Sequence, residues 1–130
     1  MPKKRIRFDA VRQMGLALPG VEEGTTYGSP ALKVGGRMFA CLAIHRSAEP
    51  DTLAVRMEFD QRDNLISTDP QTYYLTDHYV NHPCVLVRLT RVHPDALRDL
   101  LLMGWRFISA GRKQKARRRV GRLRAAGPLR

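Results

Sequence analysis

Strict alternation of apolar and polar side chains runs through Leu53-Ala-Val-Arg-Met-Glu-Phe59, near the middle of the chain. In an extended strand the odd-numbered positions, which are all apolar, fall on one side, whereas Arg56 and Glu58 fall on the other. This period of two predicts a strand with one buried face and one exposed face. The rest of the fold can be built outward from it.

Further strands are predicted on both sides of this stretch. Before it, the apolar runs 31–34 and 37–44 are joined by Gly35-Gly36, and two glycines in succession favour a hairpin because both can adopt positive φ. After it, residues 72–76 and 84–90 have the composition of strands. The polar residues 22–28 are predicted to form a turn, so five strands are expected.

Three amphipathic helices are predicted over residues 9–18, 60–68 and 94–110. Asp9 and Asp60 stand where N-caps are favoured, and Pro94 stands where a first-turn proline is tolerated. The resulting order is α-β-β-β-α-β-β-α. Short connections make the five-stranded sheet antiparallel, and three helices suffice to cover one face of it. The expected fold is an α+β two-layer sandwich with the other sheet face open.

The net charge of +11 comes from the two ends of the 130-residue chain. Residues 1–7 hold four cations and residues 111–130 hold nine, with no acid in either segment, whereas residues 8–110 hold ten cations and all 12 acids. We therefore expect a basic N-terminal arm (1–7), a single near-neutral domain (8–110) and a basic tail (111–130) that is flexible or partly helical.

Two sets of cations are candidates for contacts with DNA phosphates. On the expected open sheet face, Lys33, Arg56 and Arg88 point outward, and Tyr74 could join them. The tail supplies the second set, which is Arg112, Lys113, Lys115, Arg117, Arg118 and Arg119. Clustered cations bind DNA largely without regard to sequence, although outward Lys and Arg residues also serve solubility. The predicted function is non-enzymatic DNA binding.

The loop after residue 76 supports a different class of function, a module that binds a small ligand or another protein. Asp77, His78 and Tyr79 gather polar groups there, and Tyr27 could lie beside them in a pocket. A metal site is not expected, because Pro83 keeps the segment with His78 and His82 from being a helix and no further ligands are evident. Neither a catalytic group nor a cofactor is predicted.

Composition also indicates a compartment. The N-terminus lacks the apolar run of a signal peptide, and no stretch approaches the roughly 20 apolar residues of a membrane span. Cys41 and Cys84 lie in apolar strand-like runs and need no disulfide partner. We expect a cytoplasmic protein without membrane contact. A monomer is favoured, although the sequence leaves the oligomeric state open.

Several motifs together resemble the MmcQ/YjbR family of small bacterial proteins, over roughly residues 9–108. They are Ala17-Leu-Pro-Gly-Val-Glu-Glu23, Tyr27-Gly-Ser-Pro-Ala-Leu-Lys-Val34, Asp77-His-Tyr79, Pro83-Cys-Val-Leu-Val87 and a closing helix with Trp105-Arg106. The resemblance implies a two-layer fold similar to secretion chaperones and frataxin. It also implies a double-wing mode of DNA binding by the curved sheet, which here would use Lys33, Arg56 and Arg88. An iron role like that of frataxin is not implied, because Asp9 is the only acid of the first helix.

Overall fold

The computed structural model describes residues 6–125, with side chains for residues 6–111. Within these residues, three helices and six strands follow one another. They are α1 (Phe8–Leu16), β1 (Val21–Thr26), β2 (Ser29–Val34), β3 (Arg37–Leu42), β4 (Thr52–Arg56), α2 (Phe59–Thr68), β5 (Tyr73–Tyr74), β6 (Cys84–Arg88) and α3 (Pro94–Ala125).

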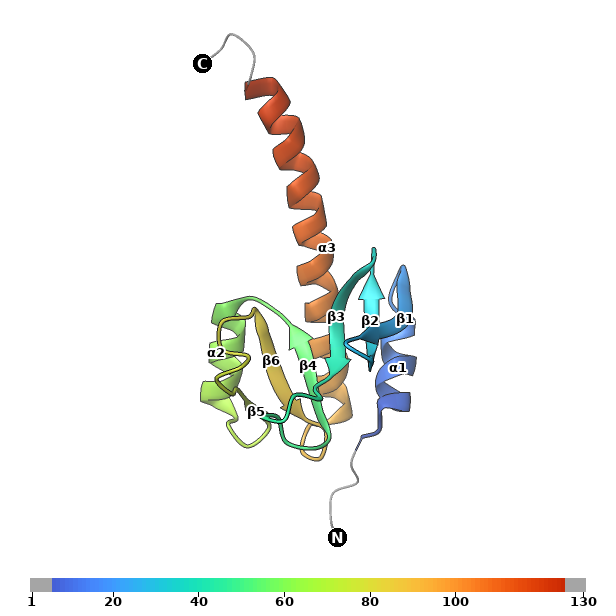
Figure 1. The fold of residues 1–130 in the computed structure, drawn as a ribbon, viewed down its shortest axis with the longest axis vertical. Coiled ribbons are helices and arrows are strands. Elements are labelled where there is room, and N and C mark those ends of the chain that lie inside the picture. Colours follow the sequence, from blue (N-terminus) through green and yellow to red (C-terminus); the bar gives the residue numbers. More distant parts are fainter. Residues whose placement is uncertain (1–5, 126–130) are drawn as a thin grey trace.

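The strands form one antiparallel sheet in the order β1-β2-β3-β4-β6-β5 (Figure 1). Helices α1 and α3 pack against strands of the β1–β4 half and α2 packs against β5 and β6. Side chains of all three helices join the sheet residues Leu32, Val55 and Val87 in one apolar core. The predicted α+β class and the predicted inward face of the strands are confirmed.

The sixth strand, β1, lies where the sequence predicted a polar turn. It pairs with β2 along its whole length, from Val21 opposite Val34 to Thr26 opposite Ser29. Tyr27 (φ 51°) and Gly28 (φ 79°) form the two-residue turn between the strands. Because β1 is an edge strand with a partner on one side only, it needs no alternation of apolar residues. The five-strand expectation missed it for that reason.

The alternating stretch that anchored the prediction ends earlier than expected. Strand β4 stops at Arg56, and Phe59 opens α2 with 44% of its surface exposed instead of pointing into the core. The expected caps Asp9 and Asp60 were also wrong, since the structure places no side-chain cap before α1 or α2 and both acids lie in the first turn. An acid there still favours the helix through its dipole.

Helix α3 lies in close contact with the sheet at Gly104. A Cβ at this position would lie 3.1 Å from the carbonyl oxygens of Phe39 and Arg56 and 3.1 Å from Cγ1 of Val55. The absence of a side chain therefore lets the helix backbone rest on β3 and β4. At the same level, the Trp105 indole N–H donates to the carbonyl oxygen of Pro19 at 2.8 Å, which ties α3 to the turn after α1.

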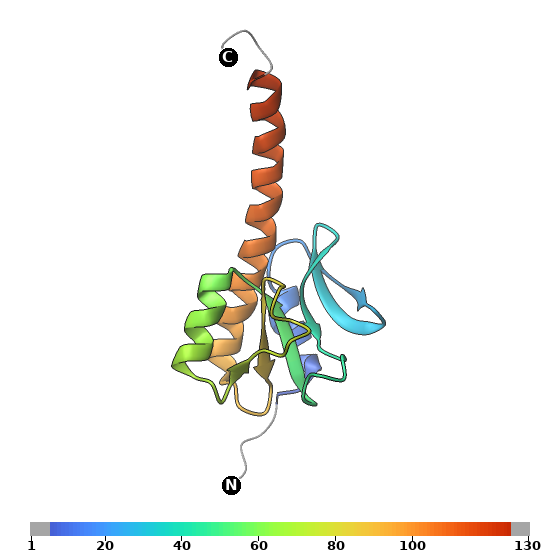
Figure 2. The ribbon, with the colours of Figure 1, turned by 60° about the vertical axis from the view of Figure 1, so that its left-hand side comes forward.

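Beyond residue 110, the predicted end of the last helix, α3 continues to Ala125 and projects away from the sheet (Figures 1 and 2). We call residues 112–125 the basic extension. Its candidate DNA contacts are therefore carried on a helix, and their side chains lie outside the described residues, as do residues 1–5 of the N-terminal arm. Within residues 6–125, no helix is long and apolar enough to cross a membrane.

Candidate functional site

The sheet face opposite the helices is partly covered rather than open. A second, smaller cluster of buried residues lies on it, formed by Ala31, Cys41, Ala54 and Leu86. Parts of the segments that follow β3 and β5 pack on this cluster. They bring Ala43, Ala48 and Tyr79. The sheet thus has apolar contacts on both faces. The two covering segments leave part of this second face uncovered, which forms a hollow.

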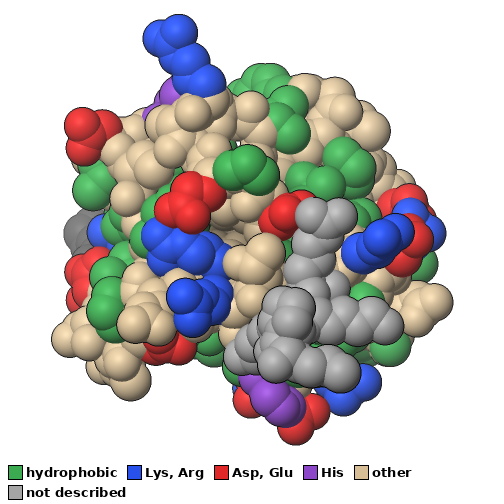
Figure 3. Space-filling view, turned by 90° about the horizontal axis from the view of Figure 1, so that it is seen from below, with side chains coloured by type: hydrophobic (Ala, Val, Ile, Leu, Met, Phe, Trp, Pro, Cys, Tyr) green, Lys and Arg blue, Asp and Glu red, His purple; other side chains and the backbone are tan. Residues whose placement is uncertain are grey.

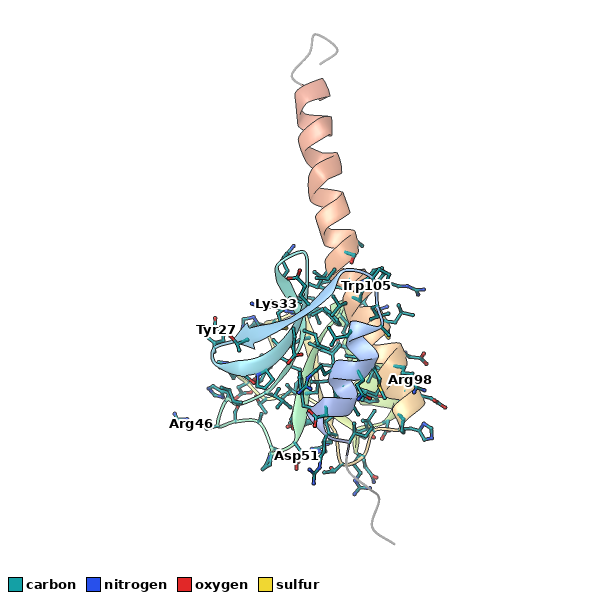
Figure 4. The ribbon with its side chains drawn as sticks, turned by 90° about the vertical axis from the view of Figure 1, so that its right-hand side faces the viewer. Tyr27, Lys33, Arg46, Asp51, Arg98 and Trp105 are labelled. Carbon is teal, nitrogen blue, oxygen red and sulfur yellow. The ribbon has the colours of Figure 1, made fainter. Side chains whose placement is uncertain are left out.

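This hollow is a pocket of about 790 Å³, which we call the sheet-face pocket. Its volume falls in the range of small-molecule sites. Strands β3, β4 and β6 provide the floor, and the β1–β2 turn and the two covering segments provide the walls. The lining residues are Thr26, Tyr27, Met38, Cys41, Leu42, Ile44, His45, Arg46, Ala54, Arg56, His78, Tyr79, His82 and Cys84. Tyr27 and Arg46 lie on the side of the molecule away from Arg98 of α3 (Figure 4).

Three rings form one wall of the pocket. His45 and His78 stack in parallel, with ring centroids 3.6 Å apart, and Tyr79 meets both at its edge. The Ser47 backbone N–H donates to Nδ1 of His45 at 3.1 Å, and the Ser47 hydroxyl bonds Thr76 at 2.8 Å. The bond between Ser47 and Thr76 joins the two covering segments. Burial, His78 and Arg46 hold the pKa of His45 below its usual value, which favours the neutral ring.

Arg62 of α2 anchors the covering segment that carries His78 and Tyr79. Its Nη1 donates to the carbonyl oxygens of Val80 at 2.9 Å and His82 at 3.1 Å, and its Nε donates to Asp63 at 3.0 Å. The residue is only 6% exposed. Sequence reasoning missed this role, because an arginine within a polar helix is normally solvated.

Arg88 performs a similar task for the other covering segment. Its guanidinium forms two bonds to the Glu49 carboxylate, at 3.0 and 2.6 Å, and Nη1 donates to the carbonyl oxygens of Pro70 and Gln71. It also lies 4.1 Å over the Tyr74 ring. The hydrogen bond to Arg88 lowers the pKa of Glu49. Arg88 thus points to the predicted face, yet its three nitrogen atoms all have partners within the protein.

Arg56 is the cation of the pocket floor. Its Nε is buried and has no hydrogen-bond acceptor among the described residues. The thiols of Cys41 and Cys84 lie near it. Burial raises the pKa of Cys84, and burial together with Cys84 raises the pKa of Cys41 to about 11, against a smaller opposing effect of Arg56. Both thiols are therefore protonated at neutral pH, which makes them poor nucleophiles.

The rate at which Cys41 is alkylated should show that its thiol is protonated, because only the thiolate reacts. In a Cys84→Ser variant, which keeps the burial of Cys41 but removes the smaller contribution of Cys84 to its pKa, Cys41 should react with iodoacetamide at pH 8 roughly 10-fold more slowly than an ordinary thiol. Reaction should accelerate as the pH rises toward 11, and mass spectrometry can follow it. The same variant unfolded in urea is the control. Equal rates in the folded and unfolded protein would contradict the assignment.

The structure brings together some predicted site residues and separates others. Tyr27, His78 and Tyr79 line one pocket. Arg56, which the sequence predicts to contact DNA, lines the same pocket. Asp77 is exposed on the same segment but does not line the pocket. Lys33 occupies the predicted sheet face near the edge, with its stem against Gly24. Basic and acidic side chains lie next to one another on the end of the molecule seen in Figure 3.

Other lining residues escaped the sequence reasoning, chiefly Met38, Cys41, Ile44 and His45. The sequence gives little indication that these residues line a pocket. His45 directly follows an apolar strand, but nothing in its neighbourhood shows that a distant segment supplies His78 to stack on it. Among the described residues, no group of three or more His, Cys, Asp or Glu side chains is placed to hold a metal ion.

Three comparisons relate the chain to known proteins. A family model described as YjbR matches residues 16–107. The chain is also similar to the crystal structure of the Deinococcus radiodurans protein DR2400, described as a DUF419 domain, with a TM-score of 0.62 and 24% identity over 81% of this chain and 78% of that one. At this identity the likeness concerns the fold. No curated protein matches the chain. The family match contains every residue of the sheet-face pocket and none of the basic extension.

Proposed function

This chain belongs to the YjbR family, and we propose that it is a non-enzymatic protein that binds a small molecule in the sheet-face pocket. The observation that carries the proposal is the pocket itself, a hollow of about 790 Å³ with an apolar floor and a few converging polar groups. This combination is typical of ligand sites. The protonated thiols of Cys41 and Cys84 support a binding role over nucleophilic catalysis.

Exposed apolar side chains at the mouth of the pocket support the same proposal. Tyr27 is 95% exposed and Ile44 is 63% exposed, the two largest values among the exposed large apolar residues of the described chain. Both line the pocket. Apolar groups gathered at the rim of a hollow are commonly covered when a partner binds. A bound ligand would remove them from water.

A thermal-shift screen of the full chain against a library of small aromatic and aliphatic compounds tests this function. A ligand present at 100 times its Kd stabilises the folded state by about 2.7 kcal/mol, which raises the Tm by several degrees. We expect at least one compound to do so. The proposal would be wrong if only duplex DNA stabilised the protein.

A pair of matched variants locates the binding. Ile44→Asp places a charge at the mouth of the pocket and should reduce the stabilisation by the ligand. Leu16→Asp makes the same change at another exposed apolar side chain, on α1, and should leave the stabilisation unchanged. Equal losses in both variants would argue against binding in the pocket.

A second candidate function, DNA binding, is favoured by the course of α3. The helix continues to Ala125 and carries eight cations and no acid between residues 112 and 125. A helix that projects from the fold with this charge is suited to contacts with phosphates that do not depend on base sequence. We assign this role to the basic extension in preference to the sheet, because Arg88 is bound to Glu49 and Arg56 lies in the pocket.

Deleting residues 111–130 should flatten the salt dependence of DNA binding. For every phosphate that the tail neutralises in the full chain, the slope of log K against log salt should fall by about 0.9 in the shortened chain. Fluorescence anisotropy with a labelled duplex, measured at several salt concentrations, gives this slope for both proteins. An unchanged slope would remove the tail from the interface.

We further propose that the protein is cytoplasmic. Both cysteines are free and buried, a state that suits a reducing compartment.

A further inference from the structure

The charge on the pocket floor lacks a counterion among the described residues. Arg56 forms no salt bridge there, and its buried Nε has no acceptor. The other two arginines that hold the pocket walls are both paired. Arg62 lies 3.0 Å from Asp63, and Arg88 lies 2.6 Å from Glu49. A buried guanidinium N–H without an acceptor costs free energy. An anion bound from solution beside Arg56 would offset that cost.

The two thiols near Arg56 and the His45 ring favour their neutral forms near pH 7, so Arg56 supplies the positive charge of the floor. The raised pKa values of Cys41 and Cys84 keep both thiols protonated, and His45 accepts a backbone N–H at Nδ1. Arg46, at the mouth, is exposed and extends away from the fold (Figure 4). One planar guanidinium matches one carboxylate, which it can bind through two parallel hydrogen bonds.

The remaining surface of the pocket suits a flat apolar group. Beside Arg56, the side chains of Ala54, Cys41 and Met38 provide an uncharged part of the floor. The parallel rings of His45 and His78, with an angle of 8° between their planes, provide a flat aromatic wall. Aromatic groups favour offset stacking and edge contacts with such rings. A ligand that fits both features combines a ring with one carboxylate.

We infer that the ligand of the sheet-face pocket is a small aromatic carboxylate, which pairs with Arg56 and lays its ring on the apolar floor against the stacked His45 and His78. This inference rests on the proposed ligand-binding function and adds the chemical class of the ligand.

Two probes of the same size test the class. Isothermal titration calorimetry of the full chain at neutral pH compares 2-naphthoate with 2-naphthalenemethanol, which has the same rings and no charge. A charge-assisted hydrogen bond to Arg56 should make the carboxylate bind roughly 10-fold to 100-fold more tightly than the alcohol.

Substitution of the arginine identifies the contact. Arg56→Gln should weaken binding of naphthoate to about the affinity of the alcohol and leave binding of the alcohol unchanged, which also shows that the variant keeps its pocket. Arg98→Gln removes an exposed cation on the opposite side of the molecule (Figure 4) and should change neither affinity.

The outcomes distinguish failure of the carboxylate inference from failure of the proposed ligand-binding function. Equal affinities for the two probes, or an Arg56→Gln variant that binds naphthoate normally, would overturn the carboxylate assignment while a ligand site remained. An equal loss in Arg98→Gln would show binding to cations in general and would also overturn it. If neither probe bound, the inference would fail, and the library screen would then decide on the ligand-binding function independently.

Discussion

Replacing Arg62 with methionine should destabilise the protein by about 2–4 kcal/mol and weaken ligand binding in the sheet-face pocket. The change leaves the carbonyl oxygens of Val80 and His82 without their charged donor. Hydrogen bonds from a charged group contribute about 1.5–3 kcal/mol each, and carbonyls that regain water recover part of the loss. The segment that carries His78 would lose its anchor. Urea denaturation gives the change in the free energy of unfolding.

The neighbouring ion pair provides the control. Asp63→Asn removes the carboxylate partner of Arg62 but keeps both bonds to the covering segment. The Asp63 side chain is 63% exposed although that of Arg62 is only 7% exposed. The asparagine oxygen can still accept from Nε of Arg62, so the loss should be about 1 kcal/mol or less. A loss in Asp63→Asn as large as that in Arg62→Met would show that the ion pair, rather than the two carbonyl contacts, holds the segment.

Gly104→Ala should destabilise the protein by about 1–3 kcal/mol, although alanine is the better helix former. The new Cβ would meet two backbone carbonyl oxygens and a Val55 methyl at 3.1 Å, and neither strand can yield cheaply. Overpacking of this kind costs more than the roughly 1 kcal/mol that helix propensity returns. Since Arg56 supplies one of those carbonyls, α3 would also press on the strand that carries the pocket cation. Thermal and urea unfolding measure the effect.

Gly111→Ala, in the same helix, should have the opposite sign. Nothing lies within 4 Å of a Cβ built at Gly111, so the variant should gain up to about 1 kcal/mol from helix propensity alone. Two glycine variants of equal stability would mean that α3 does not approach the sheet as closely at Gly104 as the structure indicates.

The layers of the fold could be predicted from the sequence because strands and helices that bury one side show apolar residues at regular intervals. The alternation around Val55 placed Arg56 on the face away from the helices, and the same reasoning placed Lys33 and Arg88 there. Strand β1 has no such periodicity of apolar residues. As an edge strand it keeps Glu22 and Glu23 exposed, so its composition resembles that of a turn.

The candidate site was harder to predict than the fold, because it depends on segments that meet only in space. Of the four residues that the sequence groups in a possible pocket, Tyr27, His78 and Tyr79 line the sheet-face pocket, whereas Asp77 does not. The sequence could not show that His45 would stack on His78, nor that Glu49 would occupy the guanidinium of Arg88. Periodicity gives the side of the sheet on which a cation lies, but it does not reveal the cation's partners. Arg56 and Arg88 look equivalent in the sequence and differ completely in their contacts.

The most direct test of ligand binding in the sheet-face pocket is chemical-shift mapping of the full chain by NMR, with 2-naphthoate and 2-naphthalenemethanol added in turn. We predict that at least one probe shifts the resonances of the floor and wall, above all the Ala54 methyl group and the Tyr79 ring. Saturable shifts confined to residues outside the sheet-face pocket would contradict binding in the pocket, and no saturable shift with either probe would overturn the assignment of an aromatic carboxylate as the ligand.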